Sequence, residues 1–362
     1  MELMAIKKVI IVGAGPSGLI LGLLLAKQGI QVELFDAGSK VVDQPRAANY
    51  ASQAVYELGR AGVLEDAKAR GFQPAGFAWR QFDGTFIAGM THAVLPDDYP
   101  TKMVSHRIVR IGQNEEQAWL DVETPTGLQK LEADYVIGCD GASSTVRREL
   151  FGSEYPGETL NAQIIATNVR SLLLLAANST LITSAQVYHN FWDSNFVVHP
   201  DYWYMAVRVT KDGLWRVTYG DKPGLSREKY IARQPQLYEK LLPGNPKPDQ
   251  YQLTNISPYK LQQRCAPSFR VGRVLLAADA EHLCNAFGGL GLTGGIADVG
   301  SLFDSLMGIH KGLADETILD RYSEIRKRIW AEIIDPMSRA NFKRLYDQDP
   351  TKARKNSSGC VL

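Results

Sequence analysis

The sequence predicts an α/β protein in which a domain built on a βαβ unit is interrupted by a β-rich insertion and followed by C-terminal helices. Strand, glycine turn, helix and strand succeed one another over Lys7–Asp36. Short strands and turns dominate residues 195–219, and strand and helix alternate again from Gly272 to Tyr346. Because strand–helix alternation is typical of parallel sheets and surrounds the β-rich middle, both ends of the chain are expected to build one discontinuous domain.

The first elements form the βαβ unit. Lys7–Val12 is a short run rich in β-branched residues, as expected for a strand that is buried on both faces. Gly13–Gly18 follows, and Leu19–Gln28 has a helical composition. Gln31–Phe35 is the second strand, and it ends at Asp36.

The remaining elements follow from composition and turn residues. Helices are expected over Gln53–Ala69, Arg227–Leu242, Ile296–Leu306 and Ile318–Tyr346, and strands over Gln117–Val122, Leu131–Gly138, Asn195–His199, Tyr202–Thr210, Leu214–Tyr219 and Gly272–Ala277.

The composition excludes several classes of protein. Apolar residues make up 45% and charged residues 22%, which argues against a disordered chain. Forty Lys and Arg against 39 Asp and Glu leave a net charge of +1 and give no indication of a nucleic-acid partner. The four scattered cysteines contain no CxxC pair, which argues against a zinc ribbon or a disulfide scaffold, and no metal site is expected. Neither a secretory segment nor an apolar run of about 20 residues is present, so we expect a cytoplasmic protein without a membrane span.

The glycine turn indicates a dinucleotide site. Gly13 permits the tight turn, Gly15 lets the backbone approach a pyrophosphate, and Gly18 allows the helix to lie close to the strand. The N-terminus of the helix then directs its free N–H groups at the phosphates. Asp36 is placed to accept hydrogen bonds from a ribose, which favours NAD or FAD over NADP. A chance match is the alternative, but the complete strand–turn–helix–strand–acid pattern argues against it.

Two later motifs extend this site. Asp140 follows a strand and precedes a helix start, where it is either a turn-and-cap residue or a cofactor contact. Asp279 stands at the end of the strand Gly272–Ala277, where a carboxylate can bind a polyol. Gly289–Gly294 also fits GxGxxG, but without a preceding strand it is interpreted as a glycine-rich approach to a helix, with simple packing as the alternative.

These three motifs, in this order, resemble the FAD-dependent group A monooxygenases, the para-hydroxybenzoate hydroxylase-like family, and in detail its fungal secondary-metabolism members. The likeness runs from Lys7 to about Tyr346. It implies a Rossmann-like FAD-binding domain with a GR2-type βαβ unit over residues 1–80, 107–165 and 260–315. It also implies a β-sheet substrate domain over residues 81–106 and 166–259, and a C-terminal helix and tail over residues 316–362.

The resemblance also implies roles for single residues. The turn, including Ser17, would hold the ADP half of FAD together with Asp36, and Arg46 would lie beside the flavin. Asp140 would lie near the pyrophosphate, with Arg147 closing that motif, and Asp279 would bind the ribityl chain. The cofactor-binding residues expected on this basis are Gly13, Gly15, Ser17, Gly18, Asp36, Arg46, Asp140, Asp279, Gly289, Gly291 and Leu292.

The reaction implied by the family is a hydroxylation. NAD(P)H, acting as a transient reductant, would reduce FAD, and O2 would add to form a C4a-hydroperoxide that hydroxylates an aromatic, polyketide-like or alkaloid-like small molecule. Epoxidation or ring-expanding oxygenation within the family is one alternative, and a degenerate flavoprotein that binds FAD without turnover is another. No catalytic base is assigned, and the oligomeric state stays open.

Aromatic residues of the β-rich middle are candidates for substrate contact. Tyr204, Trp215 and Tyr219 stand on neighbouring predicted strands, although for any single one of them ordinary sheet packing is the favoured explanation. His282 is a further polar residue near Asp279, placed either for acid–base work or for hydrogen bonding near the cofactor.

Two segments depart from the family pattern. Pro96–His106 is too short for a helix that the family has before the strand starting near Arg107, and Arg170–Val187 reads as an extra segment. Genuine divergence and an error in the gene structure both explain these departures. If they are genuine, FAD is expected to be held less tightly than in relatives.

Overall fold

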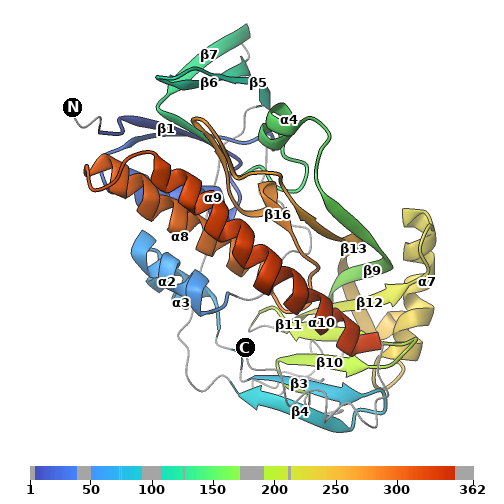
Figure 1. Cartoon of the computed structure of the whole chain (residues 1–362). Helices are drawn as coiled ribbons and strands as arrows, with labels where there is room; N and C mark the ends of the chain where they lie inside the picture. The colour runs from blue at the N-terminus through green and yellow to red at the C-terminus, as the bar shows by residue number, and fades with distance from the viewer. Residues whose placement is uncertain are drawn as a thin grey trace.

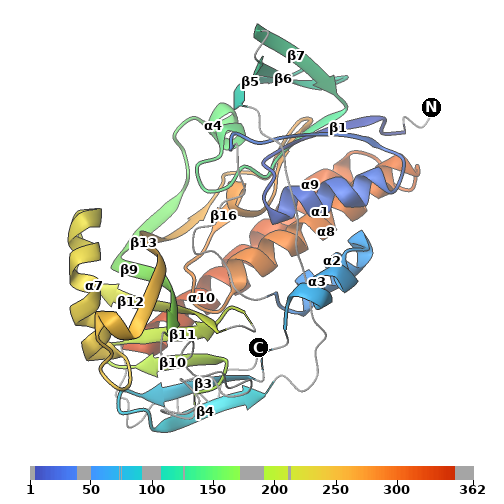
Figure 2. The same ribbon diagram turned by 180° about the vertical axis from the view of Figure 1, so that it is seen from behind.

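The computed structural model describes residues 5–38, 50–72, 74, 76–91, 107–124, 127–171, 191–210 and 213–346 of the chain. These residues form three sheets together with helices (Figures 1 and 2). The segments Pro96–His106 and Leu172–Val187, and Arg46, lie outside the described residues.

A five-stranded sheet with the order β14-β15-β8-β1-β2 brings together both ends of the chain. Its strands are β1 (Lys8–Val12), β2 (Gln31–Phe35), β8 (Tyr135–Gly138), β14 (Arg270–Val271) and β15 (Val274–Leu276). β2, β1, β8 and β15 are parallel, and β14 is an antiparallel edge strand. The short apolar strands β1, β8 and β15 suit this position because covered parallel sheets bury both faces of their inner strands.

Helices cover this sheet. α1 (Pro16–Ala26) packs against α8 (Leu290–His310), and α8 in turn packs against α9 (Thr317–Ile329) and α2 (Ser52–Ala61), which α3 (Leu64–Arg70) follows. A short helix, α4 (Thr145–Phe151), follows β8. Figure 1 shows α8 and α9 running side by side from this sheet toward the second sheet.

An eight-stranded sheet, with the order β16-β13-β9-β12-β11-β10-β3-β4, contains the middle of the chain. Its strands are β3 (Gly76–Gln81), β4 (Phe86–Thr91), β9 (Gly157–Ser171), β10 (Ser194–Val198), β11 (Tyr204–Arg208), β12 (Leu214–Asp221), β13 (Tyr251–Cys265) and β16 (His282–Leu283).

The two faces of this sheet pack against different helices. α7 (Arg227–Leu241) contributes Tyr230, Tyr238 and Leu241 to the cluster on one face. α10 (Asp335–Tyr346) contributes Phe342 and Leu345 to the cluster on the other face, together with Phe287. We call the second face the Phe287 face.

A third, antiparallel sheet is small. It consists of β5 (Arg107–Gln113), β6 (Ala118–Thr124) and β7 (Gly127–Ala133), and Figure 1 shows it projecting at one end of the molecule. Short 3-10 turns at Pro248–Gln250 and Ala278–Ala280 complete the elements.

The structure differs from the sequence-based expectations at three points, each with a physical cause. The helix expected over Gln53–Ala69 is two helices, because Gly62 adopts a left-handed conformation (φ 74°) that ends α2. The strand expected over Leu131–Gly138 is divided between β7 and β8. Asp134 stands at the division, and its carboxylate accepts the N–H groups of Lys7 and Lys8 at 2.6 and 2.8 Å.

The last helix is also interrupted. Between α9 and α10, residues Trp330–Ile334 form a π-helical turn. Pro336 follows immediately in the first turn of α10 and has no N–H to donate to the preceding turn, which favours such an irregularity. Among the helices of the described residues, none is both long enough and apolar enough to cross a membrane.

Candidate functional site

The segments that follow four parallel strands meet at one edge of the five-stranded sheet. Gly13 N–H donates to Phe35 O at 2.6 Å, so the turn after β1 is joined to the end of β2. Cys139 N–H donates to Val12 O at 2.6 Å, and Ala277 N–H donates to Gly138 O at 2.9 Å. The residues after β1, β2, β8 and β15 therefore form one continuous carboxyl edge, which is where ligands bind in open α/β sheets.

The glycine turn leaves room at one position and none at two others. A Cβ at Gly13 (φ +102°) would lie 2.3 Å from Cys139 O, and a Cβ at Gly18 would lie 2.0 Å from Gly13 O. A Cβ at Gly15 would meet no atom within 4 Å. Gly13 and Gly18 thus allow close approach within the fold, whereas Gly15 borders open space at the N-terminus of α1, where it is the N-cap without a side-chain hydrogen bond. Ser17, in the first turn of α1, is buried.

Asp36 contacts the glycine turn. Its Oδ2 accepts the N–H of Ala14 at 2.8 Å, and its Oδ1 accepts the N–H of Gly38 at 2.7 Å. This carboxylate fixes the turn and also places negative charge beside it. In a dinucleotide-binding fold, an acidic side chain at this position accepts hydrogen bonds from the ribose.

Asp140 caps the helix after β8. Its carboxylate accepts hydrogen bonds from the hydroxyl of Ser144 at 2.5 Å and from the N–H groups of Thr145 and Val146 at 2.6 and 3.2 Å. Burial raises the pKa of Asp140, and these hydrogen bonds oppose the rise. The cap role considered for Asp140 from the sequence is therefore present in the structure.

Arg147 and Tyr155 connect this helix to the segment around Asp279. The Arg147 guanidinium donates to Ala280 O at 3.0 Å and lies 3.6 Å from the centroid of the Tyr155 ring. The Tyr155 hydroxyl donates to Asp279 O at 3.2 Å. The segments after β8 and β15 are thus held together by contacts to backbone carbonyls.

The backbone beside Asp279 has an unusual conformation. Ala278 has a backbone φ of 60°, a conformation that residues other than glycine adopt only at a cost in free energy. A Cβ at Gly295 of α8 would lie 2.6 Å from the Ala278 Cβ, so α8 approaches this strained residue closely. The sequence indicated Asp279 but not Ala278, because an alanine in a sequence gives no sign that its φ is positive.

A glycine pair leads into α8. Gly288 (φ +109°) and Gly289 (φ +67°) are both left-handed, and Gly289 is the N-cap of α8 without a side-chain cap. Gly291 and Leu292 lie in the first turn of the helix and are partly exposed, and Gly289 is exposed. The N–H groups of this turn are available to an anionic partner.

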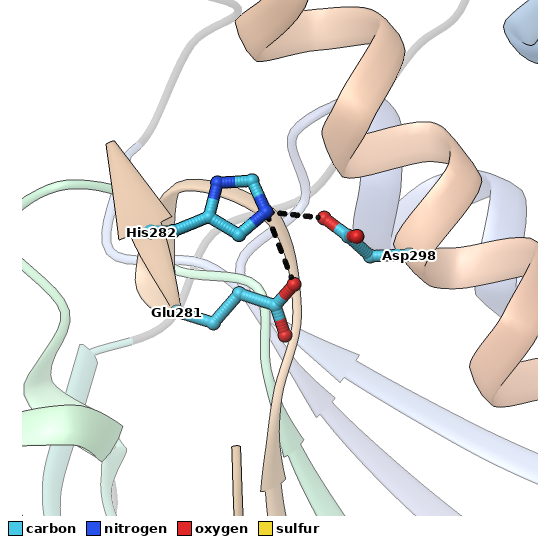
Figure 3. A group of neighbouring side chains, drawn as sticks. All are labelled: Glu281, His282 and Asp298. Carbon is cyan, nitrogen blue, oxygen red and sulfur yellow. Dashed lines mark hydrogen bonds and ion pairs between the residues drawn. The ribbon is translucent and has the colours of Figure 1, made fainter. Parts of the chain in front are cut away.

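A buried charge cluster connects Glu281 and His282 with Asp298 of α8 (Figure 3). His282 Nε2 lies 3.0 Å from Asp298 Oδ2 and 3.3 Å from Glu281 Oε1. Arg326 of α9 donates from Nε to Asp298 Oδ1 at 2.5 Å, and the Tyr322 hydroxyl donates to Glu281 Oε2 at 2.8 Å. The cluster therefore joins the segment after β15 to two helices.

The charges of this cluster follow from its contacts. Burial alone would lower the pKa of His282, but the charge and hydrogen bond of Asp298, with those of Glu281, raise it to about 10. Burial would raise the pKa of Asp298, but the charges of His282 and Arg326 lower it to about 2. Burial and the nearby Asp298 raise the pKa of Glu281. A protonated His282 and an ionised Asp298 thus form a charged pair at neutral pH.

The same three side chains have the composition of a metal site, since their ligand atoms lie within 4.8 Å of one another. The guanidinium of Arg326 already neutralises Asp298, and a cation would have to displace or repel it. The cluster is better described as an ion-pair network than as a metal centre.

The substrate candidates Tyr204, Trp215 and Tyr219 lie on the α7 face of the eight-stranded sheet. They are buried in the cluster that contains Tyr230 and Tyr238 of α7. Burial raises the pKa of Tyr204 and of Tyr219, and the Tyr219 hydroxyl makes no hydrogen bond to the described residues.

The opposite face is the one near the glycine pair. Trp203 lies with its ring centroid 5.6 Å from that of Phe287, directly before Gly288. The sequence indicated aromatic strands but not which face meets the site, because alternation assigns two faces without saying what covers each.

The described residues fit FAD. Gly15 offers open space at a helix N-terminus, and Asp36 and Asp279 stand at the same carboxyl edge. Between Asp279 and Gly288, the buried Asn285 Nδ2 has no hydrogen-bond partner among the described residues, so this segment holds a spare donor. A dinucleotide cofactor requires this combination of close backbone approach and polar groups.

Comparisons with known proteins agree with this geometry. The family described as "FAD binding domain" matches residues 7–107 and 101–336. Para-nitrophenol 4-monooxygenase of Pseudomonas sp. (strain WBC-3) is 35% identical over 370 residues, covering 95% of this chain and 88% of that protein. 6-Hydroxy-3-succinoylpyridine 3-monooxygenase HspB of Pseudomonas putida (strain DSM 28022 / S16) is 32% identical over 378 residues, covering 96% and 91%.

A solved structure is similar over the same extent. The crystal structure of p-nitrophenol 4-monooxygenase PnpA from Pseudomonas putida DLL-E4 superposes with a TM-score of 0.86 at 33% identity, covering 98% of this chain and 92% of that chain. These relatives are bacterial, so they give no support to the fungal secondary-metabolism type expected from the sequence. The match over most of the chain shows that it belongs to the FAD-binding-domain family of group A flavin monooxygenases and is an FAD-dependent monooxygenase.

Proposed function

We propose that this monooxygenase hydroxylates a small, single-ring aromatic compound, with NAD(P)H as the transient reductant and O2 as the source of the oxygen atom. The observation that carries the proposal is the carboxyl edge of the five-stranded sheet, along which Gly15, Asp36 and Asp279 follow β1, β2 and β15. Two of the relatives above 30% identity support the substrate class, since their names specify a nitrophenol and a hydroxypyridine. A polyketide or alkaloid substrate, which the fungal type would suggest, has no comparable support.

The chain's own residues would bind and orient the cofactor. Gly13–Gly18 and the N-terminus of α1 would receive the pyrophosphate, Asp36 the adenosine ribose, and Asp279 the ribityl chain. Arg46 would lie beside the flavin. The first turn of α8, from Gly289 to Leu292, would direct N–H groups at the electron-rich edge of the flavin ring. Bound FAD supplies electron transfer from NAD(P)H and activation of O2.

The substrate would lie between the glycine pair and the Phe287 face of the eight-stranded sheet. Trp203 and Phe287 form an apolar wall there, in edge-to-face contact at 5.6 Å. Such a wall would exclude water from the reacting carbon, which an oxygen-transfer step requires. In this assignment, residues 81–106 and 166–259 act mainly as the substrate domain. Strands β3, β9 and β13 extend its sheet beyond those limits, and β16 lies wholly outside them.

The test is a turnover measurement on the FAD-loaded protein. We expect slow NAD(P)H oxidation alone, faster oxidation with 4-nitrophenol or another monocyclic phenol, and a product that carries one oxygen atom from 18O2. A product with an epoxide or an enlarged ring would instead identify the alternative oxygenations. A bound flavin that neither NADH nor NADPH reduces would contradict catalysis and favour a non-catalytic flavoprotein.

A further inference from the structure

The net charge of the buried cluster of Glu281, His282, Asp298 and Arg326 depends on a single proton. Glu281 and Asp298 are 0% exposed, His282 is 2% exposed and Arg326 is 8% exposed, so water and salt screen these charges little. Asp298 lies between the two basic groups, because its Oδ1 accepts from Arg326 Nε and its Oδ2 lies 3.0 Å from His282 Nε2. One carboxylate therefore serves two cations, and the protonation of Glu281 decides whether the cluster as a whole is charged.

The contacts of Glu281 favour its protonated form. The Tyr322 hydroxyl has a single hydrogen and two acceptors within reach, Glu281 Oε2 at 2.8 Å and Leu276 O at 2.9 Å. When Glu281 carries a proton, both contacts can be hydrogen bonds, since Glu281 then donates to the Tyr322 oxygen and Tyr322 donates to Leu276 O. Burial and the charge of Asp298 also raise the pKa of Glu281. With Glu281 neutral, the cluster has a net positive charge.

This charge lies beneath the first turns of α8. In Figure 3 the His282 ring stands between the carboxyl groups of Glu281 and Asp298, with Nε2 directed at both. A Cβ at Gly294 would lie 3.7 Å from His282 Cε1, and Asp298 follows about one turn later in the same helix. At a rise of about 1.5 Å per residue, Gly294 and Asp298 stand about 7.5 and 13.5 Å along the axis from the N-cap Gly289. The cluster is therefore close to the turn that would face the flavin.

We propose that the cluster is a buried positive charge that stabilises the negative charge gained by the flavin on reduction, and that it thereby raises the reduction potential of the bound FAD. The inference rests on the proposed function, since it takes the turn Gly289–Leu292 to face the flavin. A hydride from NAD(P)H carries two electrons and one proton to FAD, leaves NAD(P)+, and gives the flavin one further negative charge. At an effective dielectric constant of about 20, unit charges about 12 Å apart change the ratio of the dissociation constants of reduced and oxidised FAD about tenfold.

The experiment measures the reduction potential of FAD bound to the protein. The FAD-loaded protein would be reduced anaerobically by xanthine and xanthine oxidase at neutral pH, with a reference dye and without substrate or NAD(P)H. His282→Gln and Arg326→Met each remove one cation, and the two side chains are chemically different. We expect each variant to lose affinity for reduced FAD about tenfold more than for oxidised FAD, which lowers the potential by about 30 mV for a two-electron couple.

Three further variants separate charge from structure. Glu281→Gln reproduces the neutral form of that carboxyl group, so we expect an unchanged potential. Arg326→Lys keeps the cation and should keep the potential. Arg328→Met removes an exposed cation from α9 and should have little effect, because water screens it. Thermal melts and titration with oxidised FAD would distinguish a loss of folding or binding from a change in potential.

Three results would overturn the proposal. An unchanged potential in folded His282→Gln and Arg326→Met would show that the charge of the cluster does not act on the flavin. A higher potential in Glu281→Gln would mean that Glu281 is ionised and the natural cluster is neutral. Equal losses of affinity for oxidised and reduced FAD would leave the cluster with a structural role alone. Failure of turnover with the expected potentials would count against hydroxylation alone, since the potentials are measured without substrate or NAD(P)H.

Discussion

The three glycines of the first turn are needed for different reasons. Alanine at Gly13 or Gly18 would collide with backbone atoms 2.3 and 2.0 Å away, whereas alanine at Gly15 would meet nothing within 4 Å and has an ordinary φ of −68°. We expect Gly13→Ala and Gly18→Ala to lower the free energy of unfolding by roughly 1–3 kcal/mol or more. Gly15→Ala should leave the stability of the FAD-free protein within about 0.5 kcal/mol.

Gly15→Ala should nevertheless weaken FAD binding, because its methyl group would enter the space beside the helix N-terminus that a pyrophosphate needs. Urea unfolding of the FAD-free protein and titration with FAD would separate the two effects. Equal FAD affinity in Gly15→Ala and the natural protein would place the pyrophosphate elsewhere.

His282 should make stability depend on pH. Its pKa is raised from the ordinary 6.5 to about 10, so the native protein holds a proton that the unfolded chain releases. The contribution is complete below pH 6.5 and is lost as the pH rises through 10. The raised pKa of Glu281 acts in the same direction.

The measurement is the free energy of unfolding in urea between pH 6.5 and about 8.5, below the range in which most thiols of the unfolded chain ionise. We expect it to fall with pH in the natural protein and to fall less steeply in His282→Gln, which keeps the bulk of the ring but cannot hold a second proton. Identical slopes would mean that the native imidazole is neutral.

At the scale of elements, a contribution of Asp140 to FAD binding can be separated from its role as a helix cap. Ser144 shares the cap, since its Oγ donates to Asp140 and accepts the N–H of Arg147 at 2.9 Å. Ser144→Ala should cost about 1 kcal/mol of stability, typical for a lost N-cap, with little change in FAD affinity. Asp140→Ala should cost a similar amount or more and should also weaken FAD binding, as the family resemblance implies.

The comparison of these two variants decides whether Asp140 contributes to FAD binding directly or only caps α4. If both lose FAD affinity equally for equal loss of stability, Asp140 acts only through α4. Circular dichroism and FAD titration of the two variants at one temperature provide the measurement.

The elements also show what a sequence can and cannot predict. β1 and β2 were predicted within a residue, because Gly13 and Asp36 mark where the two strands end and the run in β1 is rich in β-branched residues. β9 and β13, each 15 residues long, were not predicted, because polar residues interrupt their alternation and Pro258 lies inside β13. Their stability comes from pairing with each other over most of their length, which is a tertiary effect.

The same limit applies to the site. Asp279 and the glycines are local motifs, and their meeting at one edge follows from parallel strands. The network of Glu281, His282, Asp298 and Arg326 includes direct contacts across 16 positions, from His282 to Asp298, and across 28 positions, from Asp298 to Arg326. These contacts depend on helix packing, which no local pattern encodes.

At the scale of the whole molecule, the strand order β14-β15-β8-β1-β2 has a consequence for biosynthesis. β1 pairs with β8 across more than a hundred residues, and β8 pairs with β15 across as many again. Loop closure of this length is slow. On the ribosome, β1 and α1 emerge early, but Asp279 and the first turn of α8 emerge only after three quarters of the chain. If Asp279 and the first turn of α8 complete the FAD site as proposed, the nascent chain would hold the glycine turn before the rest of the site, and we expect cofactor loading only after these residues have been synthesised.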